Sequence, residues 1–493
     1  MGIEKAKNYV GGKWILPEHC EWLDVHNPST GEVVGQVPIS SRSDVDMAAA
    51  RASEAFREWK NLPVSRRVQP LYRLAAMLRE NEEEISRTLT LEMGKSLPDA
   101  RAEMKRAIEN CEAACGMPML QQGRNLIGAS SEIDGEVLML PVGVFAAITP
   151  FNFPAMVPFW FFPYALATGN TFILKPSERV PFTMQVVTRL IDKAGFPPGV
   201  FNLVNGDRGA AEAILENPLI KGVSMVGSTN VCRIVAEKCA RAGKRFQAMG
   251  SAKNHLVVMS DARIEDAVRN MVTSCYGCAG QRCMASSAIV AVGEETYRNV
   301  CDRFTEASRN VLVANPLDPR YAGEEMLMGP VISRKAKDFI LGMIETGISE
   351  GATLALDGRN LVVKGCEKGY FIGPTVFTDV KPGMKIHSTE IFGPVVVILK
   401  ADNLDSAIDI INRHRYGNGA SIYTQNGYYA RKFKLETEAG MIGINVGIPA
   451  PVAPLPFGGM KESQFSDIKA QGREIINFYT EHKVVTERYW PER

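Results

Sequence analysis

Thr171-Phe-Ile-Leu174 is a short apolar run, and it opens the part of the chain that decides the fold. Helix-like and strand-like stretches alternate after it: a helix at 182–194, a strand at 200–204, a helix at 209–215 and a strand at 222–226. Short apolar strands separated by helices of this length are typical of βαβ units, in which helices cover both faces of a parallel sheet. The sequence therefore predicts an α/β fold.

The carboxyl ends of these strands are the expected ligand-binding edge of the sheet. Dinucleotides bind at that edge in Rossmann-like folds, and Lys175 and Gly227-Ser228 stand there in this sequence. A Gly-x-Gly-x-x-Gly fingerprint is absent from the chain. A nicotinamide cofactor therefore cannot be inferred from that motif.

Helices dominate the sequence before this region. Ser43-Asp-Val-Asp46 has the form of a capping box, which predicts a helix that runs to about Lys60. Leucines and an isoleucine at helical spacing over 71–85 predict one long amphipathic helix that ends near Gly94. A further helix is expected over 99–116.

Strands are expected on both sides of the alternating region. The apolar run 142–148 stops at Thr149-Pro-Phe-Asn152, and residues 123–140 form a hairpin signal with a turn at Asp134-Gly135. A second strand and helix series over about 254–423 predicts another α/β domain. Residues 477–486 are again strand-like, and such a peripheral strand commonly completes a sheet in another subunit.

Composition excludes several classes of partner. The chain has 493 residues, with 56 Lys and Arg against 55 Asp and Glu, so its charge gives no reason to expect nucleic acid or an anionic membrane. Its N-terminus lacks the apolar run of a secretory signal. Ten cysteines without regular spacing are typical of reduced thiols, and we expect a cytoplasmic protein.

Gly280-Gln-Arg-Cys-Met284 carries the candidate nucleophile, Cys283. A cysteine beside glycine and arginine can have an accessible sulfur and a stabilised thiolate. Taken alone, however, a cysteine is more often a small core residue. Cys275 and Cys278 also suggest a thiolate metal site, but no second Cys or His pair completes a tetrahedral shell, so no metal is predicted.

Several separate segments together resemble the aldehyde dehydrogenase superfamily, in that family's order and over nearly the whole chain. These segments are Asn27-Pro-Ser-Thr-Gly31, Leu91-Glu-Met-Gly-Lys95, Thr149-Pro-Phe-Asn-Phe-Pro154, Lys175-Pro-Ser-Glu178, Val226-Gly-Ser228, Gly280-Gln-Arg-Cys283, Glu390-Ile-Phe-Gly-Pro394 and Pro456-Phe-Gly-Gly459.

The resemblance implies that Cys283 is the nucleophile and that Asn152 is the side-chain donor of an oxyanion hole. The chemistry agrees with these roles, because a thiolate that adds to an aldehyde creates an alkoxide. The Asn152 amide and a backbone N–H near Cys283 would stabilise that alkoxide while hydride leaves for a nicotinamide. The alternative for Asn152 is a turn-capping residue before Pro154.

The resemblance also implies a cofactor site. The family places Lys175 and Glu178 at the adenosine ribose and Glu390 at the nicotinamide ribose. Glu178 would accept hydrogen bonds from ribose hydroxyls but repel a 2′-phosphate, so NAD is expected rather than NADP. Further cofactor contacts are implied at Thr149, Phe151, Arg179 and Ser228. For Arg179 and Ser228 the alternatives are a solvated arginine and a helix cap.

One departure from the family concerns the acyl acceptor. Hydrolytic members carry a water-activating glutamate in Glu-Leu-Gly-Gly-Lys, whereas this chain has Gln247-Ala-Met-Gly-Ser-Ala-Lys253, with Met249 at that place. A thioether cannot accept a proton from water at neutral pH. Together with 151–156, 252–255 and 281–285, this absence resembles the methylmalonate-semialdehyde dehydrogenase branch, which transfers the acyl group to coenzyme A. Coenzyme A brings its own ionisable sulfur and needs no base there.

The same branch uses two arginines to hold the substrate carboxylate, and the matching residues are Arg106 and Arg282. Two guanidinium groups can fix a carboxylate in one orientation. The alternative for Arg106 is a solvated helix face.

The resulting expectation is a protein of three parts. Residues 1–122 and 141–250 form a Rossmann-like NAD-binding domain, 251–450 a catalytic α/β domain, and 123–140 with 468–493 a small β oligomerisation unit. The expected reaction is oxidation of malonate or methylmalonate semialdehyde with NAD, with acyl transfer to coenzyme A and loss of carbon dioxide. The assembly is expected to be a homo-oligomer, either a dimer or a tetramer.

Two other functions remain open from the sequence. The first is a hydrolysing dehydrogenase, for example of succinate semialdehyde, with a base elsewhere. The second is a catalytically silent family member.

Overall fold

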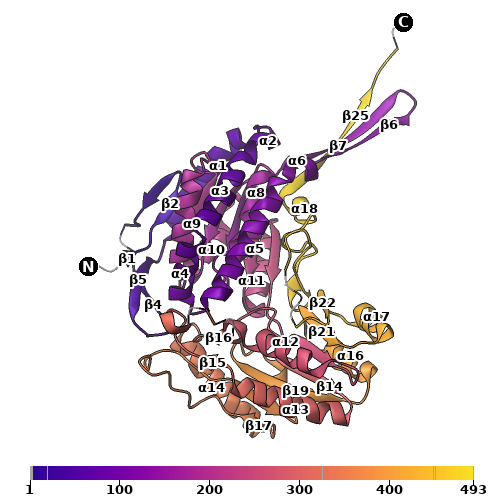
Figure 1. Ribbon diagram of the computed structural model, residues 1–493. Coiled ribbons are helices and arrows are strands. Elements are labelled where there is room, and N and C mark those ends of the chain that lie inside the picture. Colours follow the sequence, from indigo (N-terminus) through magenta and orange to yellow (C-terminus); the bar gives the residue numbers. More distant parts are fainter. Residues whose placement is uncertain are drawn as a thin grey trace.

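The computed structural model describes residues 4–18, 20–321, 323–324, 326–447, 449 and 451–491, and Figure 1 shows their arrangement. The first large sheet has the strand order β24-β12-β11-β8-β9-β10-β2-β3, and its five central strands are parallel. Its strands are β2 (Asn8–Val10), β3 (Lys13–Ile15), β8 (Val144–Ile148), β9 (Thr171–Lys175), β10 (Phe201–Leu203), β11 (Ile220–Val226), β12 (Arg245–Met249) and β24 (Gln464–Phe465).

Side chains that alternate along the central strands build a separate core on each face of this sheet. On β8, Phe145 and Ala147 pack into one core, whereas Val144, Ala146 and Ile148 pack into the other. This is the period of two that a strand imposes, and burial on both faces explains the continuous apolar runs. The predicted α/β fold with covered parallel strands is confirmed.

Two groups of helices cover these faces. One core is covered by α1 (Arg42–Trp59), α10 (Arg208–Glu216) and α11 (Thr229–Arg241). The other is covered by α2 (Val64–Arg67), α3 (Gln69–Glu80), α4 (Glu82–Met93), α5 (Leu97–Cys115), α6 (Met117–Leu120), α7 (Met156–Phe159), α8 (Phe162–Ala167) and α9 (Phe182–Lys193).

Two details of the first helices differ from the prediction. The cap of α1 is Ser41, whose hydroxyl and Asp44 form the capping box, so the box lies two residues before the predicted one. The single helix predicted up to Gly94 is interrupted at Asn81, which ends α3 and precedes α4. Gly94 does end α4, in the left-handed conformation (φ 89°) that glycine adopts without strain.

The second large sheet has the order β17-β18-β19-β14-β13-β21-β22, and only β17 is antiparallel to its neighbour. Its strands are β13 (His255–Val258), β14 (Ala288–Val292), β17 (Thr353–Leu356), β18 (Thr375–Thr378), β19 (Val395–Ala401), β21 (Gly419–Tyr423) and β22 (Met441–Ile444). The associated helices are α12 (Ile264–Tyr276), α13 (Glu294–Arg309), α14 (Arg334–Ser349), α15 (Lys385–Ser388), α16 (Leu404–Arg413) and α17 (Gly427–Glu436). The predicted second α/β unit is confirmed.

A three-stranded sheet projects from the body as an arm (Figure 1). It consists of β6 (Arg124–Ser130), β7 (Ile133–Pro141) and β25 (Thr480–Arg488), which follows the short helix α18 (Ile475–Tyr479). The predicted hairpin is present, but its turn lies at Ser131-Glu132, where Glu132 has φ 62°. Asp134-Gly135 lies inside β7, so the turn prediction was wrong. The C-terminal strand pairs along its length with β7 of its own chain.

Smaller sheets complete the structure. They are formed by β1 (Glu4–Lys5), β4 (Trp22–His26) and β5 (Val33–Pro38), by β15 (Leu312–Val313) and β16 (Leu327–Met328), and by β20 (Tyr416–Gly417) and β23 (Met460–Lys461). Within the described residues, no helix combines the length and the apolar character that crossing a bilayer requires.

Candidate active site

A cavity of about 260 Å³ brings Cys283 together with both predicted arginines, Arg106 and Arg282. Arg106 comes from α5, whereas the other two residues lie on the segment that leads into β14. Most of the remaining wall is apolar or acidic: Asp99, Ala102, Glu103, Phe153, Met156, Trp160, Met284, Pro451 and Phe457. The cavity therefore combines a thiol, two guanidinium groups and an apolar lining.

A strained turn carries the chain from α12 to the thiol. Cys278, Ala279 and Gly280 all have positive φ, at 57°, 53° and 73°. A Cβ atom at Gly280 would lie 2.3 Å from the carbonyl oxygen of Gly393, so no other residue fits there without displacing backbone. Left-handed non-glycine residues cost free energy and concentrate at functional sites, which agrees with the position of this turn just before Cys283.

The thiol of Cys283 is protonated at neutral pH in this structure. Burial and the neighbouring charge of Glu390 raise its pKa to about 12, against the opposing effect of the backbone N–H groups of Cys283 and Met284. The guanidinium of Arg282 contributes least to lowering that pKa. Arg282 does favour the thiolate, as expected, but its effect is the smallest of those that lower this pKa, and its guanidinium is also paired with Asp99.

Arg282 forms an ion pair in the wall of the cavity. Its Nη2 donates to Asp99 Oδ1 at 2.7 Å, and the pairing raises the pKa of the guanidinium further despite its burial. Its Nε is buried and has no hydrogen-bond partner among the described residues. Asp99 was not singled out in the sequence; only its place two residues into α5 identifies it as a first-turn acid.

Arg106 lies on the same helix, half-buried, with its Nη1 2.6 Å from Glu109 Oε2. Its side chain is 34% exposed and lines the cavity, so its helix face is neither fully solvated nor fully buried. Both arginines are thus paired with carboxylates of this chain and at the same time border the space beside the thiol.

Asn152 is fixed beside the nucleophile segment by a buried ion pair. Its Nδ2 donates to the carbonyl oxygen of Gln281 at 3.0 Å, while its own backbone oxygen accepts from Lys95 Nζ at 2.7 Å. Lys95 is paired with Glu103 at 2.6 Å, and both side chains are fully buried. Glu103 also accepts from the backbone N–H of Ala155 at 2.8 Å, which orders the start of α7. These contacts connect Asn152 to the nucleophile segment, so it does more than cap a turn.

The carboxyl edge of the first sheet carries polar groups that fit a dinucleotide. Lys175, which ends β9, donates to Pro176 at 3.0 Å and lies 3.5 Å from Glu178; burial lowers the pKa of its amine, and Glu178 opposes that effect. The buried hydroxyl of Thr149 has no partner in the part of the chain that the structure describes. Ser228 begins α11 without a side-chain cap hydrogen bond, which leaves its hydroxyl available. Helix N-termini favour phosphate groups.

The other predicted cofactor residues lie around this edge. The ring of Phe151 meets that of Phe392 edge-on, with centroids 5.8 Å apart. Arg179 is placed in the turn after β9, where its backbone N–H donates to Ser177. Glu390 is partly buried and accepts from the backbone N–H of Ala252 at 2.9 Å, and desolvation raises the pKa of its carboxyl.

Met249, at the place of the hydrolytic glutamate, ends β12 and is 3% exposed. Its side chain belongs to the large core cluster against which Cys283 packs. A thioether there adds apolar surface and no base.

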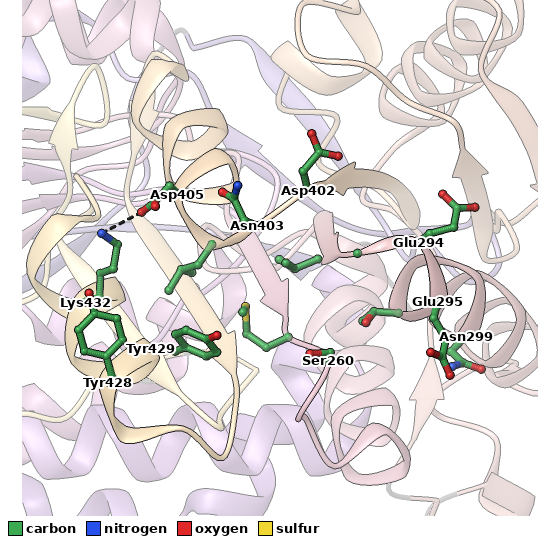
Figure 2. A pocket seen from close by; sticks show the side chains of 15 residues that line it. Ser260, Glu294, Glu295, Asn299, Asp402, Asn403, Asp405, Tyr428, Tyr429 and Lys432 are labelled. Atoms are coloured by element: carbon green, nitrogen blue, oxygen red, sulfur yellow. Dashed lines mark ion pairs between the residues drawn. The ribbon is translucent and has the colours of Figure 1, made fainter.

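A second cavity, of about 600 Å³, lies at the carboxyl edge of the second sheet (Figure 2). It is formed where β13, β14 and β19 end, and the ion pair of Asp405 with Lys432 borders it at 2.8 Å. None of the residues singled out from the sequence lines this cavity, so the candidate site remains the one around Cys283.

Comparisons with known proteins agree with this geometry. The family model described as "Aldehyde dehydrogenase family" matches residues 14–485. Malonate-semialdehyde dehydrogenase 1 of Geobacillus kaustophilus (strain HTA426) is 45% identical over 484 residues, which cover 98% of this chain and 97% of that protein.

Solved structures are also similar to this chain. The methylmalonate-semialdehyde dehydrogenase of Oceanimonas doudoroffii is 39% identical, with a TM-score of 0.96 that covers 100% of this chain and 99% of that one. An aldehyde dehydrogenase from Bacillus cereus in complex with NAD⁺ is 31% identical, with a TM-score of 0.93 over 98% and 97% of the two chains.

Proposed function

The chain belongs to the aldehyde dehydrogenase family, and from this premise we propose that it oxidises malonate or methylmalonate semialdehyde with NAD through a thioester on Cys283. The acyl group is then transferred to coenzyme A. The bond between the carboxylate carbon and the α-carbon breaks to release carbon dioxide, and the α-carbon takes up a proton in its place. The names of the relatives support the substrate class, and the NAD⁺ complex of a relative supports the cofactor.

One observation carries the proposal: the cavity that holds the Cys283 thiol also has two guanidinium groups in its wall. A semialdehyde of this class has an aldehyde at one end and a carboxylate at the other. Arg106 and Arg282 would bind the carboxylate while the aldehyde carbon meets the sulfur. A dehydrogenase for a neutral aldehyde would not need this pair of charges.

The Cys283 thiol gives up its proton to solvent, and its sulfur forms a bond to the aldehyde carbon while the π electrons of the C=O bond move to the oxygen. The product is a thiohemiacetal oxyanion. The Asn152 amide and a backbone N–H beside Cys283 stabilise that oxyanion. NAD, when bound, would supply the hydride acceptor for this oxidation. Thr149, Phe151, Lys175, Glu178, Arg179, Ser228 and Glu390 would hold it.

The cycle is completed when the coenzyme A thiol loses its proton and its thiolate attacks the thioester carbonyl. The sulfur of Cys283 then leaves as a thiolate, which takes up a proton. This step needs no general base at position 249, since the acceptor has an ionisable sulfur of its own. The buried thioether of Met249 supports a thiol rather than water as acceptor.

The test is NADH production from malonate semialdehyde with and without coenzyme A, with identification of the product. We expect turnover to depend on coenzyme A and to yield an acyl-coenzyme A. Equal rates without coenzyme A and a free acid as product would favour the hydrolytic alternative, and no NADH under any condition would favour a silent family member.

We further propose the three-part organisation with the bounds expected from the sequence, and a homo-oligomer held together by the arm. Exposed apolar residues on the arm support an oligomer: Leu126, Ile127, Val484, Tyr489 and Trp490. All ten cysteines are free thiols, which supports a reducing compartment such as the cytoplasm.

A further inference from the structure

The backbone carbonyl of Cys283 accepts two side-chain hydrogen bonds. Asn254 Nδ2 and Asn418 Nδ2 each donate to this oxygen at 2.9 Å. Asn254 directly precedes β13 and Asn418 directly precedes β21, and these two strands are parallel neighbours in the second sheet. The sheet thus presents two amides at its amino edge, both directed at the nucleophile's own carbonyl.

Further contacts fix both amides. Asn254 Nδ2 also donates to Ala285 at 3.0 Å, and Asn254 Oδ1 accepts from the backbone N–H of Gly419 at 2.9 Å. Asn418 Nδ2 also donates to Met284 Sδ at 3.0 Å. The two asparagines are 3% and 5% exposed. Their positions are therefore set by the sheet and not by mobile side chains.

The two hydrogen bonds to the carbonyl oxygen of Cys283 fix the orientation of the whole Cys283–Met284 peptide. A trans peptide is planar, with its C=O and N–H on opposite sides, so fixing the Cys283 oxygen also fixes the N–H of Met284. This N–H and that of Cys283 lower the pKa of the thiol. Hydrogen bonds at the oxygen also polarise the peptide and strengthen its N–H as a donor.

We propose that Asn254 and Asn418 are positioning residues, which hold the Cys283–Met284 peptide so that its N–H faces the sulfur and favours the thiolate. Neither asparagine needs to touch the substrate for this effect. The significance for catalysis rests on the proposed role of Cys283 as the nucleophile, but the effect on the thiol itself does not.

The test is the rate of iodoacetamide alkylation of Cys283 as a function of pH, followed by mass spectrometry of the peptide that contains Cys283. The thiolate is the reactive form, so the rate reports its population. We expect Asn418→Leu and Asn254→Leu each to shift the profile upward by about one pH unit, which is roughly a tenfold slower reaction at a fixed pH below the pKa. If Asn254→Leu does not fold, the alkylation profile of Asn418→Leu is sufficient for the test.

Asn202, which lies in β10 of the first sheet, provides a matched control. Its Nδ2 donates to the carbonyl oxygens of Phe172 and Gly199 at 3.3 and 2.8 Å, and its Oδ1 accepts from the backbone N–H of Gly11 at 3.0 Å. Asn202→Leu removes the same kind of contacts as Asn254→Leu, so it lowers stability but leaves the alkylation profile unchanged.

An unchanged profile in the folded Asn418 variant, or an equal shift in the Asn202 variant, overturns the proposal. Failure of the proposed function is separate: it would appear as absent coenzyme A-dependent NADH in the unmodified protein, whatever the alkylation profiles show.

Discussion

Arg282 donates from Nη2 to Asp99 Oδ1 at 2.7 Å, while its Nε stays buried without a hydrogen-bond partner among the described residues. A buried donor left unpaired costs free energy comparable to a lost hydrogen bond. Arg282 is therefore held in place by one carboxylate, on the wall of the cavity that contains Cys283.

Substitution of Arg282 should weaken binding of substrates that carry a carboxylate. Arg282→Lys keeps the charge but loses the fork of donors, and a charge-assisted hydrogen bond contributes about 1.5–3 kcal/mol, so we expect KM for malonate semialdehyde to rise roughly 10- to 100-fold. Steady-state kinetics on malonate semialdehyde and on propanal separate this effect from general damage. Equal losses on both substrates would contradict the carboxylate role.

Arg106 should act in the same way, and α5 offers a matched control. Arg101, on the same helix, pairs with Glu83 at 2.9 Å and lies outside the cavity lining. We expect Arg106→Gln to raise KM for the semialdehyde about tenfold or more, and Arg101→Gln to leave it unchanged. If the two variants behave alike, Arg106 belongs to a solvated face, as its helical spacing alone allows.

Much of the fold could be predicted because local signals and tertiary packing agree. The strand predicted at 171–174 and the helix predicted at 182–194 lie within one residue of the observed β9 and α9. A short apolar run that stands between two helical stretches is readily identified as a strand buried on both faces. Asp134-Gly135 misled the hairpin prediction, because turn propensity is local whereas register follows the pairing of β7 with β25. The bounds of the three domains stay a prediction.

The candidate site was predicted less completely. Motifs located Cys283, Asn152 and the two arginines, and the structure brings these four close together around one segment. The ion pair of Arg282 with Asp99 could not be predicted, because it joins positions 183 residues apart through folding alone. The same holds for Asn418 at the carbonyl of Cys283, where the separation is 135 residues.

The charge of Glu390 should suppress the thiolate of Cys283 in the cofactor-free protein. Glu390 is the second cause, after burial, of the raised pKa of the thiol. Glu390→Gln removes this negative charge, which lowers the pKa of Cys283 and increases the thiolate population at any pH below it. We expect faster alkylation at pH 8 than in the unsubstituted protein, measured by the loss of free Cys283 with time. Slower or unchanged alkylation would show that the charge does not reach the sulfur.

Met249→Glu should introduce hydrolysis. A carboxylate at the end of β12 could accept a proton from water, so we expect free acid and NADH to appear without coenzyme A. Burial of a carboxylate also lowers stability, and Met249→Gln reproduces the polar burial without the base. Product analysis by chromatography distinguishes them: free acid from both variants, or from neither, contradicts the explanation of the missing glutamate.

Three buried histidines should make the protein sensitive to acid. His255 and His387 share a hydrogen bond at 2.8 Å, and burial lowers the pKa of His387 to about 3 and that of His414 to about 4. Unfolded histidine has a pKa of about 6.5, so the unfolded state binds protons first as pH falls. Stability should therefore decrease below pH 6.5 and continue to fall toward pH 4, by up to about 1.4 kcal/mol per pH unit for each histidine.

Urea unfolding midpoints at pH 7, 6 and 5 measure this sensitivity. His387→Phe should flatten the decrease, whereas substitution of His482, which is exposed on β25, should leave it unchanged. An acid decrease of the same steepness in the His387 variant would assign it to other groups.

The covalent intermediate is tested most directly by peptide mass spectrometry after the protein is mixed with NAD and malonate semialdehyde in the absence of coenzyme A. We expect the peptide that contains Cys283 to gain one acyl group, and we expect coenzyme A to remove that group as acyl-coenzyme A. NADH formation with Cys283 unmodified throughout, or with full activity retained in Cys283→Ala, would contradict the thioester mechanism.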